Sequence, residues 1–362
     1  MPLSKIQLPS LERAHAKNLI VNGNFEVDQR GSLGTPVTSA STNYPRSVDG
    51  NWMCVEQTDG QISVGKVADA PSGTGLKSSF KVTVTSADTS LAAAQRMAPT
   101  HSIEASTWQH LEWHTANAKS IAVQFQVKCS VAGTYGFTFR TSGSGMSYTH
   151  PYTISSANTW EKKTFTIPGP TSLLGGSVGS GNNLFYYIIF GLGLGTDFDT
   201  GANDAWTAVG NGQGRSSHTN LMATNNATWQ ITGFQIEEGN SHSEFQHETD
   251  TENLMRCQRY YQNSFEHGNA PGTSTDSDDS QLTTSWTDGN APFPPFPTTM
   301  RAKPTITFRA RNQTSTGTIN NGGSSRTASA SGISNKGVSY ISVTSGTGGQ
   351  YNAFTYECSA EI

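Results

Sequence analysis

Several short motifs in this sequence contain residue types found in catalytic or metal sites. The first, Gly175–Gly179, reads Gly-Gly-Ser-Val-Gly and fits the pattern G-x-S-x-G. A serine nucleophile in that pattern lies at a sharp turn between a strand and a helix. Here glycine and asparagine follow the serine and no helical pattern begins, so we interpret the segment as a glycine-rich loop.

A second motif, His110–His114, places two histidines four residues apart. On a helix, two such side chains could bind zinc together. In the metalloprotease motif, however, glutamate directly follows the first histidine, and Leu111 has that position here. The segment precedes the clearest strand of the sequence. We therefore expect a loop or short strand in which the two histidines do not converge, and no metal.

Acidic residues cluster in two loops. Asp276, Asp278 and Asp279 form one cluster, and Asp197 and Asp199 form the other. Such oxygen clusters can bind Ca²⁺. The spacing of a calcium-binding EF-hand loop is absent, so the sequence favours solvated acidic turns. A structural calcium ion is the weaker alternative, and no other cofactor is expected.

Glycoside hydrolysis requires two carboxyl groups about 5–10 Å apart across a cleft. Glu237 and Glu238 are neighbours in a predicted strand, and successive side chains of a strand point to opposite faces. The other carboxylates do not pair by sequence. We expect no enzymatic activity, and a polysaccharide depolymerase is the less favoured alternative.

Tryptophans in polar or loop-like stretches are candidates for sugar binding. An exposed aromatic face can stack on a sugar ring while nearby polar groups bind its hydroxyls. Trp206, between Asn203-Asp204 and glycine-rich turns, is the best candidate. For each tryptophan, burial in the core is the alternative. The predicted glycan-binding residues are Trp206, Trp108, Trp113 and Trp52.

The composition is typical of a loop-rich β protein. Charged residues make up only 14% and there are 37 glycines, yet 7 Trp, 11 Tyr and 16 Phe are present. Disordered chains are charged and poor in aromatics, unlike this one. The net charge is −4 and there is no long basic run, which argues against nucleic-acid binding. No 18-residue apolar run and no apolar leader are present, so we expect neither membrane insertion nor secretion.

Alternating side chains predict many strands. In 121–129, every second residue is apolar, a period of two that indicates a half-buried strand. Tyr135, Phe137 and Phe139 repeat this pattern after Ala132-Gly133 and predict a hairpin with the first strand. The segment 184–190 is apolar on both faces, which predicts a central, doubly covered strand. Further strands are predicted at 61–67, 79–85, 160–167 and 229–237.

One helix is predicted at 250–261. Thr249 and Glu252 fit a capping box, and Leu254, Cys257 and Tyr261 then share a face. The four cysteines are far apart, without a C-x-x-C pair, so we expect buried free thiols. They are Cys54, Cys129, Cys257 and Cys358.

The sequence therefore predicts an all-β fold, a jelly-roll β-sandwich followed by a linker helix and a smaller C-terminal β domain. The sandwich is placed at 18–248, the helix at 249–262 and the C-terminal domain at 263–362. Residues 1–17 are interpreted as a docking tail, with a frayed terminus as the alternative.

The start of the sandwich resembles a known family. Residues 18–31, NLIVNGNFEVDQRG, resemble the NLIINGxFxxxQRG opening of virion proteins from tailed phages, especially phages of marine bacteria. Residues 229–237 and 256–261 are similar to that family's ITGVQLE strand and CQRYY helix end. The resemblance covers roughly residues 1–262, and residues 297–305 extend it weakly.

This resemblance implies a structural component of a virion, a tail or head fibre or appendage that attaches to host surface glycans. The alternative is a purely structural decoration or adaptor protein. The implied partners are other virion proteins, contacted through the tail at 1–17, host polysaccharide, and two further copies in a homotrimer. The implied location is the virion, assembled in the host cytoplasm.

Overall fold

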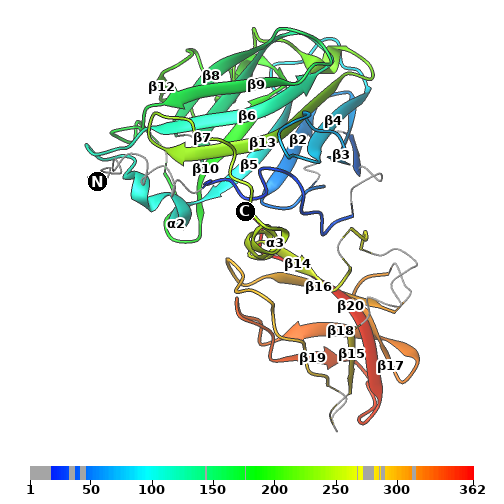
Figure 1. Ribbon diagram of the computed structural model, residues 1–362. Helices are drawn as coiled ribbons and strands as arrows, with labels where there is room; N and C mark the ends of the chain where they lie inside the picture. Colours follow the sequence, from blue (N-terminus) through cyan, green and yellow to red (C-terminus); the bar gives the residue numbers. More distant parts are fainter. Residues whose placement is uncertain are drawn as a thin grey trace, which may run out of the picture.

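The computed structural model describes residues 18–31, 37–40, 46–142, 145–175, 177–266, 268–271, 281–284, 286, 290–311 and 315–362. The predicted docking tail at 1–17 and the predicted calcium ligands Asp276, Asp278 and Asp279 lie outside the described residues. The described part consists of a two-sheet sandwich, a helix beside it and a third sheet beyond the helix (Figure 1). The predicted all-β fold is confirmed.

The first sheet of the sandwich has six antiparallel strands. Its strands, in spatial order, are β1 (Val37–Ala40), β3 (Gln61–Val67), β4 (Ser79–Ser86), β13 (Thr228–Glu238), β6 (Ile121–Cys129) and β9 (Glu161–Ile167). All of the predicted strands except 184–190 and the one with Tyr135 lie in this sheet.

The second sheet has seven antiparallel strands, and β2 lies beside β5 at one margin. Its strands are β2 (Trp52–Gln57), β11 (Gly193–Leu194), β5 (Arg96–Glu104), β10 (Leu184–Gly191), β7 (Gly133–Thr141), β8 (Ser147–Ile154) and β12 (Trp206–Thr207).

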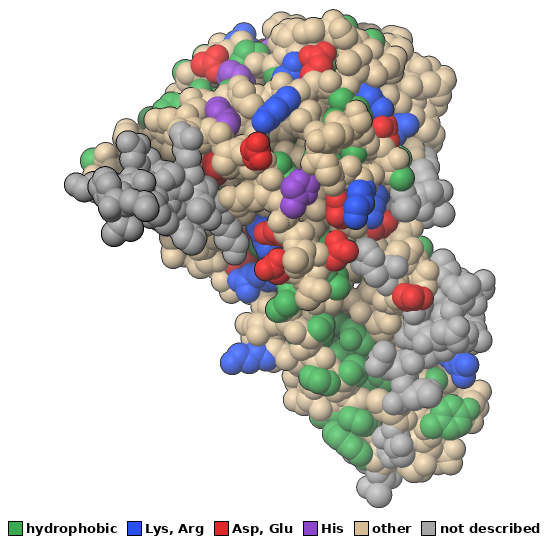
Figure 2. Space-filling model, in the orientation of Figure 1, with side chains coloured by type: hydrophobic (Ala, Val, Ile, Leu, Met, Phe, Trp, Pro, Cys, Tyr) green, Lys and Arg blue, Asp and Glu red, His purple; other side chains and the backbone are tan. Residues whose placement is uncertain are grey.

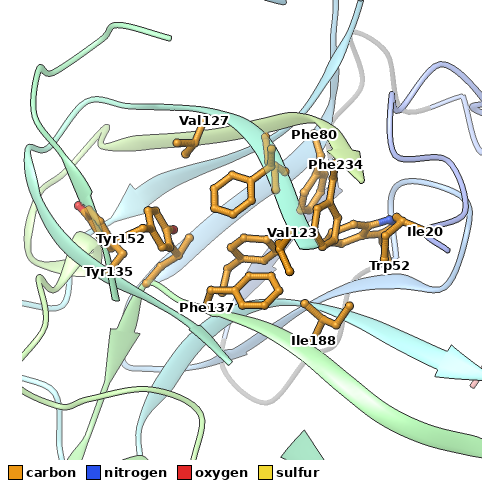
Figure 3. Close-up of a cluster of buried hydrophobic side chains, with 14 of the residues drawn as sticks. Ile20, Trp52, Phe80, Val123, Val127, Tyr135, Phe137, Tyr152, Ile188 and Phe234 are labelled. Carbon is orange, nitrogen blue, oxygen red and sulfur yellow. The ribbon is translucent and has the colours of Figure 1, made fainter. Parts of the chain in front are cut away.

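Aromatic side chains fill the space between the two sheets (Figure 3). Phe125 of β6 is 1% exposed, and Phe137 of β7 is fully buried. The ring centroid of Phe137 lies 5.3 Å from that of Phe190 and 6.1 Å from that of Phe234. Fully burying one such side chain stabilises the fold by roughly 1.5–3 kcal/mol. The apolar rows of β6 and β7 therefore face the core, as their alternation predicted.

The predicted hairpin between β6 and β7 is wrong. β6 pairs with β9 and β13, whereas β7 pairs with β8 and β10 in the other sheet. Alternation is the same in a hairpin and in a crossing between sheets, and the crossing lets the two apolar rows face each other. Gly133 permits this connection, because its φ is +150° and an added Cβ would lie 2.1 Å from Oγ1 of Thr219.

The strand predicted to be central is central. β10 lies between β5 and β7. Its inward row, Tyr186, Ile188 and Phe190, is buried. On the outward row Ile189 is buried, but Tyr187 is only half-buried. The double coverage expected from the sequence is therefore incomplete at Tyr187.

The capping box predicted for the helix is present. α3 (Asp250–Gln258) begins after Thr249, whose hydroxyl accepts from the Glu252 N–H, and the Glu252 carboxylate accepts from the Thr249 N–H. The helix ends three residues before the predicted Tyr261. Tyr261 instead begins a strand whose pairing with the third sheet overrides the helical periodicity. The remaining helical turns are α2 (Ala105–Trp108), η2 (Gln109–Leu111), η3 (Thr196–Phe198) and η4 (Leu221–Ala223).

The third sheet surrounds β20 (Tyr351–Ser359), which pairs with four strands. A smaller core of its own includes Phe293, Phe308 and Phe354. The other strands are β14 (Tyr261–Asn263), β15 (Gln281–Thr284), β16 (Thr305–Ala310), β17 (Thr318–Asn321), β18 (Ser324–Ser331) and β19 (Tyr340–Val343).

Polar contacts fasten the sandwich to the helix and to the end of the chain. The buried Glu104 carboxylate accepts from the guanidinium of Arg259 and, at 2.9 Å, from the hydroxyl of Tyr260. Arg30 pairs with Glu361 at 2.6 Å. The C-terminus accordingly lies beside α3 (Figure 1), and α3 is a packed joint rather than a loose connection.

All four cysteines are free and buried, as predicted. Burial raises the pKa of the Cys54 and Cys358 thiols far above the ordinary range. Among the described residues, no helix has both the length and the apolar character needed to cross a membrane.

Candidate functional site

Three of the four tryptophans predicted to bind sugar are buried, and that prediction is wrong for them. Trp52 is 0%, Trp108 1% and Trp113 6% exposed. Trp52 packs against Phe25 at 5.1 Å, and Trp108 and Trp113 pack edge-to-face at 5.4 Å. Trp52 begins β2, Trp108 ends α2 and Trp113 lies in the turn after η2, and all three rings fold into the core. None of the three can offer an open face to a ligand.

Trp206 is half-buried at the edge strand β12. Its indole Nε1 donates to the Pro168 carbonyl at 2.8 Å, and its ring packs against Trp113 and Tyr148. One side of the ring is thus occupied by the protein. Its role in sugar binding stays a prediction.

The two histidines of the His110–His114 motif do not converge, as expected, although part of the motif forms the turn η2 rather than a loop or strand. His110 lies 3.9 Å from the Glu238 carboxylate. His114 stacks on Tyr186, and its Nε2 is 3.2 Å from the tyrosine hydroxyl. Within the described ranges, no group of three or more His, Cys, Asp or Glu side chains could hold a metal ion.

The remaining motifs singled out in the sequence are an acidic loop, a glycine-rich segment and a pair of glutamates. Asp199 pairs with Arg215 at 2.8 Å and accepts from the Ser216 hydroxyl at 2.8 Å, so its carboxylate oxygens are engaged by side chains of the same chain. Residues 177–180 form an irregular loop without a following helix. Glu237 is buried and Glu238 is exposed, which places the two carboxylates on opposite faces.

The outer face of the second sheet contains a cavity that sequence analysis did not identify. Its volume is about 250 Å³. The outward rows of β2, β5, β10 and β7 form its floor, and a loop after β12 forms its side. It is lined by Met53, Val55, Arg96, Thr100, Arg140, Tyr187, Ile189 and Gln213.

Strand register brings these side chains together. Tyr187 of β10 lies directly opposite Arg140 of β7, and Ile189 lies opposite Thr100 of β5. The Arg140 guanidinium carbon is 5.3 Å from the Tyr187 ring centroid, within the range of a cation–π interaction. The half-buried tyrosine therefore offers both a ring and a hydroxyl beside a positive charge.

Gln213 joins the two arginines of the cavity. With its side-chain oxygen turned toward them, it accepts from Nη1 of Arg96 and, at 3.2 Å, from Nη1 of Arg140. Arg96 also donates from Nε to Gln57 at 2.7 Å and lies over the ring of Phe198. Burial, and next the charge of Arg96, lower the pKa of Arg140.

The cavity was missed because its parts are far apart in the sequence. In any one strand, an outward arginine or tyrosine resembles an ordinary solvated position. The available signal was the pair Tyr186 and Tyr187, whose hydroxyls are the polar side-chain groups of this otherwise apolar strand. The neighbours of Tyr187 follow only from the strand order.

The outer face of the first sheet differs, because residues 242–246 of the same chain lie across it. The Gln235 side chain donates to the Ser243 hydroxyl at 2.9 Å and accepts from the Gln246 N–H at 2.8 Å. The Glu237 carboxylate accepts from the Ser243 N–H at 2.6 Å. These polar groups are satisfied within the chain. On the face seen in Figure 2, charged side chains are scattered among uncharged polar ones over the sandwich.

Comparison with known proteins gives remote structural likenesses. Neither a protein-family model nor a curated protein matches the chain. The enzymatically active domain of tailspike protein 4 from bacteriophage CBA120 aligns over 61% of this chain and 21% of its own, with 11% identity and a TM-score of 0.31. A family 4 carbohydrate-binding module aligns over 60% of this chain and 99% of its own, with 13% identity and a TM-score of 0.30.

A family 11 carbohydrate-binding module from Clostridium thermocellum, in complex with a β-1,3-1,4-mixed-linked tetrasaccharide, aligns over 56% of this chain and 99% of its own. Its identity is 11% and its TM-score 0.30. The aligned region thus spans about a fifth of the tailspike chain and nearly the whole of each module. The likeness is one of β-sandwich fold alone.

Proposed function

We propose that this chain is a glycan-binding subunit of a phage appendage, and that the cavity on the outer face of the second sheet binds the sugar. The observation that carries the proposal is the cavity itself. It combines the half-buried ring of Tyr187 with polar groups from Thr100, Arg140 and Gln213. An aromatic ring beside a few fixed polar groups is the usual composition of a sugar site.

The assignment to a virion rests on the sequence. Residues 18–31, 229–237 and 256–261 resemble segments of tailed-phage virion proteins. A single small sugar site of this kind binds weakly. Several copies in an oligomer, as proposed for fibres and appendages, would convert weak single sites into firm attachment through avidity.

The binding proposal is tested on a glycan array with the purified chain and three variants. Tyr187→Ala removes the stacking ring, and we expect about tenfold weaker binding, equivalent to about 1.4 kcal/mol. Tyr351→Ala removes an exposed tyrosine from the third sheet and is the matched control, with no expected effect. Trp206→Ala tests the candidate chosen from the sequence.

The outcomes separate the functions under consideration. Loss of binding in Trp206→Ala but not in Tyr187→Ala would move the site to the edge strand β12. Binding to no glycan, together with antibody labelling of the chain on intact phage particles, would favour a purely structural decoration or adaptor. Absence of the label from purified particles would contradict the virion assignment.

A further inference from the structure

Two guanidinium groups share one side of the cavity on the second sheet. With the side-chain oxygen of Gln213 turned toward them, Arg96 and Arg140 both donate to it, so two positive charges converge on one neutral acceptor. Gln213 is 1% exposed, which fixes this acceptor in place. Like charges so close together repel each other, and the repulsion is stronger where water is partly excluded.

Several half-buried arginines elsewhere in the described part of the chain have carboxylate partners, whereas Arg301 donates to backbone carbonyls. Arg30 pairs with Glu361 at 2.6 Å, and Arg309 pairs with Glu357 at 2.5 Å. Arg259 pairs with the buried Glu104. Arg140 makes no ion pair with any described residue, and its contacts are the Tyr187 ring, the Thr141 carbonyl and Gln213. Its positive charge is therefore held in the cavity by neutral groups.

The rest of the cavity is apolar enough to receive a sugar ring beside these charges. Met53, Val55 and Ile189 line the floor next to Tyr187. A guanidinium presents its N–H donors in a planar fork that matches a carboxylate or a sulfate better than a lone hydroxyl. Charge and ring contacts thus meet within one cavity.

Building on the proposed function, we propose that this cavity selects an anionic glycan, whose carboxylate or sulfate group is bound by Arg140 together with Arg96. The acidic group would give Arg140 the anionic partner that it lacks among the described residues. The sugar ring that bears the group would lie against Tyr187 and Ile189.

The test compares anionic polymers with neutral ones of matched backbone. Polygalacturonate is paired with the galactan obtained by reducing its carboxyl groups, and dextran sulfate is paired with dextran. Binding is measured by isothermal titration calorimetry at low and high salt. We expect at least tenfold tighter binding to one anionic polymer than to its neutral partner, with the preference decreasing as salt screens the charges. The pair that shows it identifies carboxylate or sulfate.

The variants assign this preference to the cavity. Arg140→Gln should lower affinity for the anionic polymer at least tenfold, and Arg140→Lys, which keeps the charge but loses the fork, should fall in between. Lys162→Gln removes the same charge from an exposed position in the first sheet and should bind like the wild type. Circular dichroism and thermal unfolding confirm that each variant is folded.

Each result has a consequence. Equal affinity for charged and neutral partners, or an Arg140→Gln variant that binds like the wild type, would overturn the anionic preference. If Tyr187→Ala still weakened the binding of a neutral polymer, the proposed glycan function would stand. Binding to no polymer of either pair would overturn the anionic preference, and absence of binding on the glycan array as well would overturn the proposed function.

Discussion

The two outer faces of the sandwich are built from the same kind of strand but are used differently. On the first sheet, Gln235 and Glu237 bind residues 242–246 of their own chain. On the second sheet, Arg140 and Tyr187 line an open cavity. The polar groups of the first sheet's outer face are hydrogen-bonded within the chain, whereas those of the second sheet's outer face are accessible to a ligand. A polar outer face therefore indicates function only where the chain does not cover it.

The largest expected effect concerns the inner side of the second sheet, which contrasts with its open outer side. His101 of β5 faces the core beside Trp52, and burial lowers its pKa to about 3. In the unfolded chain it titrates near pH 6.5, so below that pH the unfolded state binds a proton that the folded state does not. The contribution of His101 to stability should therefore fall by about 1.4 kcal/mol per pH unit as pH decreases from 6.5 toward 3. The buried carboxyl of Asp49, whose pKa burial raises to about 7, contributes in the opposite direction.

Urea unfolding at several pH values measures this dependence. His101→Gln should reduce the slope, whereas Arg140→Gln, on the outer side of the same sheet, should leave it unchanged. An unaltered slope in His101→Gln would show that other groups cause the acid sensitivity.

The next effect tests the covered face. Gln235→Ala removes the buried amide that binds Ser243 and Gln246 and leaves the Gln246 N–H without its acceptor. We expect a loss of about 2 kcal/mol in the free energy of unfolding, with glycan binding unchanged. Gln126→Ala on the same sheet is the matched control and should change stability by less than about 0.5 kcal/mol. Weakened glycan binding in Gln235→Ala would mean that the covered face also binds ligand.

The smallest effect tests the open face. Arg140→Gln removes one of two like charges but also a contact with Tyr187, so we expect unfolding free energy to change by less than about 0.5 kcal/mol. Arg309→Gln, which breaks the pair with Glu357 in the third sheet, should cost about 1 kcal/mol. Chemical denaturation of both variants measures the difference. A larger loss in Arg140→Gln than in Arg309→Gln would assign Arg140 to folding rather than to binding.

Local features were predictable from the sequence, and features made by strand order were not. The strand at 121–129 and the cap at Thr249 depend on neighbouring residues, so alternation and spacing were sufficient to predict them. The sheet in which β7 lies depends on distant partners, and the predicted hairpin failed for that reason. The burial of Trp52, the first residue of β2, depends on the pairing of that strand with β5. The cavity around Tyr187 required five segments to meet.

The four buried thiols can report the order in which parts of the molecule unfold. Cys54 and Cys129 lie in the sandwich, Cys257 in the joint helix and Cys358 in the third sheet, all shielded from solvent. An alkylating reagent added at rising denaturant concentration would mark each site only once its surroundings loosen. Peptide masses would then rank the order of opening in the unmodified chain, without a fluorescent label or an engineered residue.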